Sequence, residues 1–188
     1  YKIIDKAIRE GVKQFIYASS GSVYGIKEEP NVTEDLPLVP ISTYNKTKMI
    51  AERVFLSYKD KIKVHNIRPA TVCGISPRMR LDVAVNLLTY QALSKGEITV
   101  LGGDQIRPNI HIDDITDLYL YIIENKSKFL SGSYNAGFEN ISILEIAKKI
   151  KNLIPCKIKI QASKDPRSYR QDSAKLLSKG FRPKKSVD

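Results

Sequence analysis

The sequence has no tryptophan, only two cysteines and two histidines, and no long apolar run. A membrane-spanning helix needs roughly 18 or more apolar residues in succession, so no membrane partner is expected. Cys73 and Cys156 lie far apart without metal-ligand spacing, and only His65 and His111 are there to join them. We therefore expect no metal site, and we interpret both cysteines as reduced, buried thiols of a cytoplasmic protein.

The chain carries a formal net charge of +11, from 31 basic and 20 acidic residues. Nucleic-acid binding requires clustered basic residues, usually with aromatic side chains between them for base stacking. Here the lysines are spread along polar faces and concentrate toward the C-terminal end without such aromatics. We interpret the charge as a solvated basic surface and expect no nucleic-acid partner, although single arginines remain candidates for neutralising a substrate diphosphate.

Helical and strand patterns alternate along the chain with short connections. This alternation is typical of an α/β layered fold with a mostly parallel sheet, and 188 residues with 42% hydrophobic content suffice for one sizeable core. Helices are predicted over 2–10, 44–58, 81–94, 113–124 and 142–153, and strands over 14–18, 62–67, 98–101, 133–136 and 157–160. The last of these strands is expected at a sheet edge.

A tyrosine and a lysine four residues apart open the second predicted helix. Because residues four apart share one helix face, the Tyr44 phenol and the Lys48 ammonium would point at the same ligand. The spacing alone is a weak signal, since ten tyrosines in a lysine-rich chain produce about one such pair by chance. A half-buried tyrosine beside a solvated lysine also explains it.

Two loops frame this helix. A serine- and glycine-rich turn begins at Ser20, directly after the first predicted strand, and the loop 68–74 follows the next strand. In a parallel α/β sheet, ligands bind beyond the C-terminal ends of the strands. Ser20 and Thr71 are therefore expected to open into one crevice, which Tyr44 and Lys48 also reach.

The order of these motifs resembles the extended branch of the short-chain dehydrogenase/reductase superfamily, the NAD-dependent nucleotide-sugar epimerases and dehydratases typified by UDP-galactose 4-epimerase. The resemblance covers nearly the whole chain. It implies the C-terminal part of a Rossmann-like doubly wound parallel sheet, with a small α/β substrate-binding region. Besides Tyr44 and Lys48, it rests on YASSGSVYG (17–25), RPATVCG (68–74), GGDQIRPNIHIDD (102–114), YNAG (134–137) and DPRSYRQD (165–172).

The resemblance also implies which parts of the family's fold are present. The family's Gly-x-x-Gly-x-x-Gly turn, which receives the cofactor pyrophosphate, does not occur in this sequence. We expect an N-terminally truncated fragment of a protein of roughly 300 residues, which alone binds NAD poorly and is inactive. Residues 1–75 would be a partial NAD-binding domain with the catalytic residues. Residues 76–188 would be mainly substrate-binding, with 98–125 partly returning to the NAD-binding domain.

The resemblance assigns the chemistry to three side chains. Tyr44 would take the proton of a sugar hydroxyl as hydride leaves the carbon for NAD. Lys48 would favour the phenolate and bond the nicotinamide ribose, and Ser20 would orient the hydroxyl. Further cofactor contacts are expected from Ala18, Ser19, Pro69, Ala70 and Val72.

The residues after Ser20 narrow the reaction. The family's dehydratases carry an Asp-Glu pair directly after this position, and the related decarboxylases carry a Glu where this chain has Ser22. Here the two residues are Gly21 and Ser22, so elimination and decarboxylation lack their acid. The expected activity is therefore NAD-dependent 4-epimerisation, with an NAD(P)-dependent reductase or dehydrogenase as the alternative. A non-catalytic module is disfavoured, because Ser20, Tyr44 and Lys48 are all kept.

The implied substrate is a nucleotide-diphosphate sugar of unspecified base and sugar. Arg107 matches the family's diphosphate-binding arginine, and Arg167 stands where another phosphate contact is common, with a surface role as the alternative for each. Arg78 and Arg80 lie in a loop that departs from the family pattern, and they either read an acidic sugar or face water.

Five further positions complete the expected substrate contacts. Val100 and Leu101 would pack on the nucleotide base, and the remaining contacts would come from Ser20, Ser22 and Thr71. By analogy with the family, the protein would form a homodimer through the 44–58 helix and its neighbour.

Overall fold

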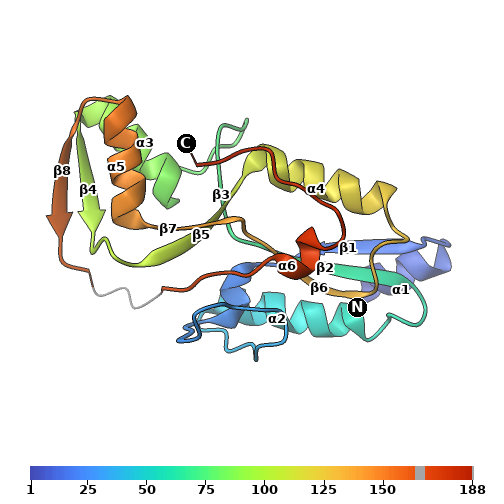
Figure 1. Cartoon of the computed structure of the whole chain (residues 1–188). Helices are drawn as coiled ribbons and strands as arrows, with labels where there is room; N and C mark the ends of the chain where they lie inside the picture. The colour runs from blue at the N-terminus through green and yellow to red at the C-terminus, as the bar shows by residue number, and fades with distance from the viewer. Residues whose placement is uncertain (164–167, 188) are drawn as a thin grey trace.

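The structure is a computed structural model that describes residues 1–163 and 168–187. Helices and strands alternate along most of the chain, and the predicted α/β class with parallel strands is confirmed (Figure 1). The helices are α1 (Lys2–Arg9), η1 (Gly21–Tyr24), α2 (Thr43–Leu56), α3 (Ala84–Lys95), α4 (Ile112–Glu124), α5 (Ile143–Leu153) and α6 (Ala174–Leu177). The strands are β1 (Gln14–Ala18), β2 (Lys63–Pro69), β3 (Thr71–Cys73), β4 (Glu97–Leu101), β5 (Ile106–His111), β6 (Gly132–Ala136), β7 (Glu139–Ser142) and β8 (Lys157–Gln161).

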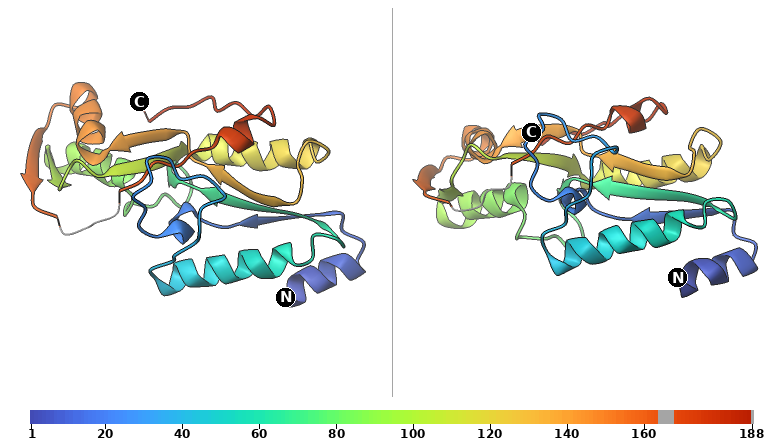
Figure 2. Two further views of the ribbon diagram at one scale, coloured as in Figure 1. Left: turned by 60° about the horizontal axis from the view of Figure 1, so that its bottom comes forward. Right: turned by 90° about the horizontal axis from the view of Figure 1, so that it is seen from below.

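The first sheet is parallel throughout and has the order β1-β2-β6. Helices α1 and α2 cover one face of it, and α4 covers the other (Figures 1 and 2). Successive side chains of a strand point to opposite faces. In β2 this sends Val64 to a cluster with Ile4 and Phe55, and sends Ile67 to the larger cluster that contains Leu118.

The remaining strands form a second three-stranded sheet with the order β3-β5-β7, and a parallel pair β4-β8. Helices α3 and α5 pack on β4 at the end of the molecule away from α1 (Figure 1). The buried residues Leu88, Ile98, Val100 and Ile146 are members of the core there. Strand β8 is exposed along most of its length, as expected for an edge.

Three strands were not expected from the sequence, namely β3, which lies in the predicted loop 68–74, and its neighbours β5 and β7. Pro108 lies inside β5 and has no backbone N–H to donate, which is why the segment does not have the pattern of a strand. Strand β7 runs antiparallel to β5 and ends at Ser142, where the capping box predicted for α5 is confirmed. The first sheet also recruits β6, which lies outside the 98–125 segment expected to return to it.

The two cysteines differ in burial. Cys73 is 3% exposed, as expected, and burial raises the pKa of its thiol to about 11. The expectation of a buried Cys156 is wrong, because this residue lies between α5 and the edge strand β8, where it is only half-buried. Within the described residues, no helix is long and apolar enough to cross a membrane.

Candidate active site

The turn after β1 places two serine hydroxyls side by side. Ser20 caps η1, and its Oγ accepts a hydrogen bond from the Ser22 backbone N–H at 3.2 Å, a role for which serine is well suited. The two hydroxyl oxygens lie 2.7 Å apart. Ser22 Oγ also donates to Asn45 Oδ1 in the first turn of α2 at 2.8 Å. The cap thus connects both hydroxyls to the helix that carries Tyr44.

Gly21 lies between these serines in a confined space. A Cβ atom added there would stand 3.0 Å from Gln171 Oε1 and 3.2 Å from the Pro69 carbonyl oxygen. These separations are tighter than ordinary van der Waals contact, so a side chain would displace its neighbours. The packing of this chain therefore disfavours an acid at position 21, in agreement with the absence of one from the sequence.

Helix α2 presents Tyr44 and Lys48 on one face. Ser42 caps the helix by accepting a hydrogen bond from the Asn45 backbone N–H. Tyr44 is 56% exposed. Lys48 Nζ donates to the Ala18 carbonyl oxygen at 2.7 Å and lies 5.6 Å from the centroid of the Tyr44 ring. The end of β1 therefore holds an ammonium group beside the phenol.

A cleft of about 870 Å³ opens between η1, the start of α2 and the junction of β2 with β3. A hollow of about 250 Å³, lined in part by Arg107, shares Ser22, Asn45 and Thr71 with it. The structure thus brings most of the predicted site residues to one connected region. The predicted residues on the wall of the cleft are Ser19, Ser20, Ser22, Tyr44, Pro69, Ala70, Thr71, Val72 and Arg80.

One buried hydroxyl in this wall fits a polar ligand group. Ser19 is 4% exposed, and its Oγ has no hydrogen-bond partner among the described residues. A buried polar group without a partner costs about 1–3 kcal/mol, which a ligand atom recovers by bonding it. Pro69, Ala70 and Val72 add apolar surface to the same cleft. This combination fits a cofactor with both polar edges and flat apolar faces, as the expected NAD has.

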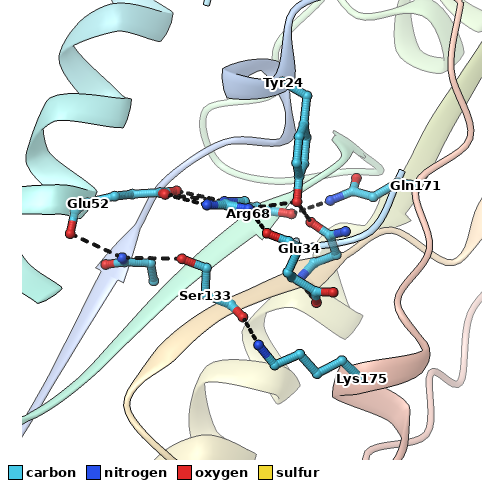
Figure 3. Close-up of polar contacts among 9 residues, drawn as sticks. Tyr24, Glu34, Glu52, Arg68, Ser133, Gln171 and Lys175 are labelled. Atoms are coloured by element: carbon cyan, nitrogen blue, oxygen red, sulfur yellow. Dashed lines mark hydrogen bonds and ion pairs between the residues drawn. The ribbon is translucent and has the colours of Figure 1, made fainter. Parts of the chain in front are cut away.

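A buried ion pair between Arg68 and Glu52 joins β2 to α2 (Figure 3). Arg68 lies on the α2 side of β2, and its Nε and Nη2 donate to Glu52 Oε1 and Oε2 at 3.0 and 2.7 Å. Burial alone would lower the pKa of Arg68, but its hydrogen bonds to Glu52 raise it, so the guanidinium stays charged. Glu52 follows Lys48 by one helical turn, so this pair positions the same helix face as the site.

The same guanidinium connects α2 to the Ser20 turn and to the C-terminal segment. Arg68 Nη1 donates to the Tyr24 hydroxyl at 2.7 Å, and Tyr24 in turn donates to Asn135 on β6. Burial raises the pKa of Tyr24 to about 12, so this phenol remains protonated. The Arg68 carbonyl oxygen accepts a hydrogen bond from Gln171 Nε2 at 2.7 Å (Figure 3). Arg68 of β2 thus bonds α2, the Ser20 turn and the segment that contains Gln171.

The other predicted arginines occupy different environments. Arg80 lines the cleft, but its Nε and Nη2 donate to Asp82 at 2.9 and 2.7 Å. Arg107 projects from β5 into the smaller hollow, where Tyr169 is also found. Arg78 is exposed and is not part of the wall of either space. Arg167 lies outside the described residues.

The prediction that Val100 packs on a nucleotide base is wrong. Its side chain is fully buried in the cluster between β4, α3 and α5, where no ligand reaches it. Leu101 is 54% exposed because neighbouring strand residues face opposite sides. It too lies outside the walls of both described spaces.

Sequence reasoning missed several residues that line this site, among them Asn45 and Tyr169. Asn45 fits the pattern of an ordinary helical residue, so the sequence offers no reason to place it in the site. Its position directly after Tyr44 nevertheless puts it in the first turn of the same helix. Tyr169 lies in the segment 165–172, where only Arg167 attracted a prediction, yet it lines both the cleft and the smaller hollow.

Comparisons with known proteins give these motifs a family. The model of the NAD dependent epimerase/dehydratase family matches residues 1–137. A UDP-glucose 4-epimerase of Lactobacillus helveticus is 30% identical over 198 residues, which cover 92% of this chain and 60% of that protein. A putative UDP-arabinose 4-epimerase of Arabidopsis thaliana is 26% identical over 201 residues, covering 93% of this chain and 46% of that protein.

Solved structures agree with the sequence relatives. A UDP-glucuronic acid 4-epimerase from Bacillus cereus, in complex with UDP-glucuronic acid and NAD, superposes with a TM-score of 0.84 at 28% identity. The superposition covers 98% of this chain and 61% of that one, so the chain spans between 46% and 61% of the length of these three proteins. Because the family model matches well over half of its residues, the chain belongs to the NAD dependent epimerase/dehydratase family.

Proposed function

We propose that this chain carries the acid–base and sugar-binding residues of an NAD-dependent nucleotide-sugar epimerase, and that the reaction is inversion at C4 of a UDP-sugar. The observation that carries the proposal is that Tyr44 lines the same cleft as Ser20 and has the Lys48 ammonium beside its ring. Positions 21 and 22 hold glycine and serine, so the acids of elimination chemistry are missing. The names of the relatives support the choice of a UDP-sugar and of C4.

In this proposal, Tyr44 accepts the proton of the sugar hydroxyl and returns it after the sugar has turned over. The Lys48 ammonium lies beside the Tyr44 ring, and the Ala18 carbonyl fixes its position. Ser20 holds the reacting oxygen. When bound, NAD supplies the reversible hydride acceptor of the reaction. Ser19, Pro69, Ala70 and Val72 would hold it, with the free Ser19 hydroxyl as one polar contact.

The substrate diphosphate belongs in the smaller hollow in this proposal. Arg107 lines it and supplies the planar donor geometry that suits phosphate oxygens. Arg80 is a weaker candidate for binding the carboxylate of an acidic sugar, because its guanidinium already donates two hydrogen bonds to Asp82. An uncharged sugar ring, contacted by Ser22 and Thr71, is therefore the favoured substrate.

In this proposal, the cofactor-binding and substrate-binding parts of the chain correspond to different sheets. Residues 1–75, together with β6 and α4, build the layered unit that holds the cofactor side of the cleft. Most of 76–188 forms the substrate side, which includes Arg107 on β5 and Tyr169.

The direct test is to incubate the intact gene product and NAD with a panel of nucleotide sugars. Product stereochemistry is followed by NMR, and NADH by absorbance. A C4 epimer formed without net NADH supports the proposal. Stoichiometric reduction or oxidation of the cofactor would replace it with the dehydrogenase alternative, and no turnover of any sugar would refute both.

A further inference from the structure

Three polar side chains form a continuous hydrogen-bonded chain along the cleft. It runs from Ser20 Oγ to Ser22 Oγ over 2.7 Å and on to Asn45 Oδ1 over 2.8 Å. Ser20, Ser22 and Asn45 all line the cleft beside Tyr44. The chain therefore connects the hydroxyl that is proposed to hold the sugar oxygen with an amide one residue from the proposed base.

The direction of this chain follows from counting protons. Ser22 Oγ has one proton, and it is donated to Asn45 Oδ1. The short contact between the serines therefore has Ser20 as its donor. Ser20 Oγ also accepts the Ser22 backbone N–H. In this resting state, Ser20 has no proton left for a ligand.

The proposed reaction needs the opposite direction. A sugar hydroxyl has one proton, which goes to Tyr44. Negative charge develops on its oxygen as that proton leaves, and it is consumed when the hydride departs and the carbonyl forms. Ser20 stabilises that charge only by donating a hydrogen bond to it. Its own oxygen must then accept from Ser22, and Ser22 must accept from another donor. An asparagine can be that donor, because its amide carries both an acceptor oxygen and a donor nitrogen.

We propose that Asn45 is a positioning residue that switches the direction of this hydrogen-bonded chain, an inference that rests on the proposed function. Half a turn of its amide lets Nδ2 donate to Ser22, Ser22 donate to Ser20, and Ser20 donate to the sugar oxygen. No covalent bond changes in this step. Each bond in a chain polarises the next, so Ser20 becomes a stronger donor at the moment when charge develops.

The surroundings of Asn45 allow this turn. Its backbone N–H is fixed by the Ser42 cap at 3.2 Å, so the helix start stays in place. Among the residues that the structure describes, its amide nitrogen has no hydrogen-bond partner. Turning the amide therefore breaks only the bond to Ser22, which the nitrogen replaces.

Replacing Asn45 by aspartate separates this role from packing. Asn45→Asp keeps the shape, but an ionised carboxylate only accepts and so holds the Ser22 proton in the resting direction. Asn45→Ala removes the partner altogether and leaves Ser22 free to donate to Ser20. The switch predicts that the shape-preserving aspartate is the more damaging change. A packing role predicts the reverse order.

A first measurement needs no substrate. Position 45 lies in the first turn of α2, where an acidic residue favours the helix, so Asn45→Asp is expected to fold well. A carboxylate also accepts more strongly from Ser22 than an amide does. Thermal unfolding is measured for wild type, Asn45→Asp, Ser22→Ala and the double variant. Aspartate at position 45 should raise the stability, and this gain should be smaller when Ser22 is replaced by alanine. A gain that is equal with and without Ser22 would overturn the assigned resting direction.

The second measurement uses turnover by the intact gene product with a UDP-sugar. Asn45→Asp should lower kcat about 100-fold, which is the cost of losing one donor to a developing oxyanion, and should leave KM nearly unchanged. Asn45→Ala should lower kcat less than about tenfold. Adding Ser22→Ala to Asn45→Asp should restore kcat about tenfold, because Ser20 is no longer held by Ser22. An aspartate variant at least as active as the alanine variant, or no recovery in the double variant, would overturn the switch. If wild type turns over no sugar, the proposed function fails, while the unfolding data still decide the resting direction.

Discussion

The Lys48 ammonium donates to the Ala18 carbonyl oxygen at 2.7 Å, and this bond joins α2 to the last residue of β1. Lys48 is also 4.9 Å from the centroid of the Tyr17 ring, so the lysine is held from two sides. A long flexible side chain loses much of its freedom when it is held in this way. Its charge therefore stays beside Tyr44 before any ligand arrives.

Removal of this charge should impair catalysis far more than folding. Lys48→Met keeps the apolar length of the side chain but leaves Tyr44 without its cation, so we expect kcat to fall about 100-fold or more. Lys46→Met on the exposed side of the same helix is the matched control, with kcat near the wild-type value. Steady-state kinetics on the two variants provide the check. Equal kcat values for the two variants would contradict the proposed catalytic role of Lys48.

Loss of the buried Arg68 charge should be costly for stability. Arg68→Met leaves the Glu52 carboxylate, which is 1% exposed, without its partner, and removal of one member of a buried pair costs about 3–5 kcal/mol. Arg80→Met breaks an exposed pair and should cost less than about 1 kcal/mol. The free energy of unfolding in urea measures both changes. Similar losses for the two variants would contradict a structural role for the buried pair.

The confined space at Gly21 predicts a position-specific effect of one methyl group. Gly21→Ala should destabilise the protein by about 1–3 kcal/mol, because Gln171 and the Pro69 carbonyl must move. Gly132→Ala is the matched control, since its added methyl would have only Lys175 Nζ nearby, at 3.9 Å. That variant should be neutral or slightly stabilised. Thermal unfolding distinguishes the two positions, and an unaffected Gly21→Ala would show that the space is larger than described.

Stability should fall in mild acid because of His65. The residue is fully buried, its Nδ1 lies 3.2 Å from the Leu130 carbonyl oxygen, and burial lowers the pKa of its imidazole. The unfolded chain then binds a proton near pH 6.5 while the folded chain does not. The contribution of His65 is thus complete above that pH and is lost below it, by up to about 1.4 kcal/mol per pH unit. His65→Gln should flatten the curve of unfolding free energy against pH between 5 and 7 (about the titration range of a histidine), and parallel curves would contradict this explanation.

Local patterns were enough to predict most of the framework. Strand β1 and the capping box at Ser142 follow from short-range signals, namely an apolar run before a serine-rich turn and a serine three residues before a glutamate. Strand β5 was not predictable in this way. Pro108 hides it, and only pairing with the distant β3 and β7 makes it a strand.

The site shows the same limit. Tyr44 and Lys48 share a face because helical geometry requires it, so their relation was readable from spacing. The bond between Glu52 and Arg68 joins residues 16 positions apart on different elements. No helical or strand periodicity in the sequence predicts this contact. The burial of Val100 likewise depends on α3 and α5, which pack over β4 only in the folded chain.

The proposed role of Tyr44 as the proton acceptor is tested most directly by Tyr44→Phe. The variant lacks only the phenol oxygen, and Tyr90→Phe at an exposed position of α3 is the control. Epimerisation of a UDP-sugar by the intact gene product should fall about 100- to 10,000-fold in kcat for Tyr44→Phe, with sugar binding by calorimetry retained and Tyr90→Phe unchanged. Turnover by Tyr44→Phe at the wild-type rate would contradict the proposed mechanism.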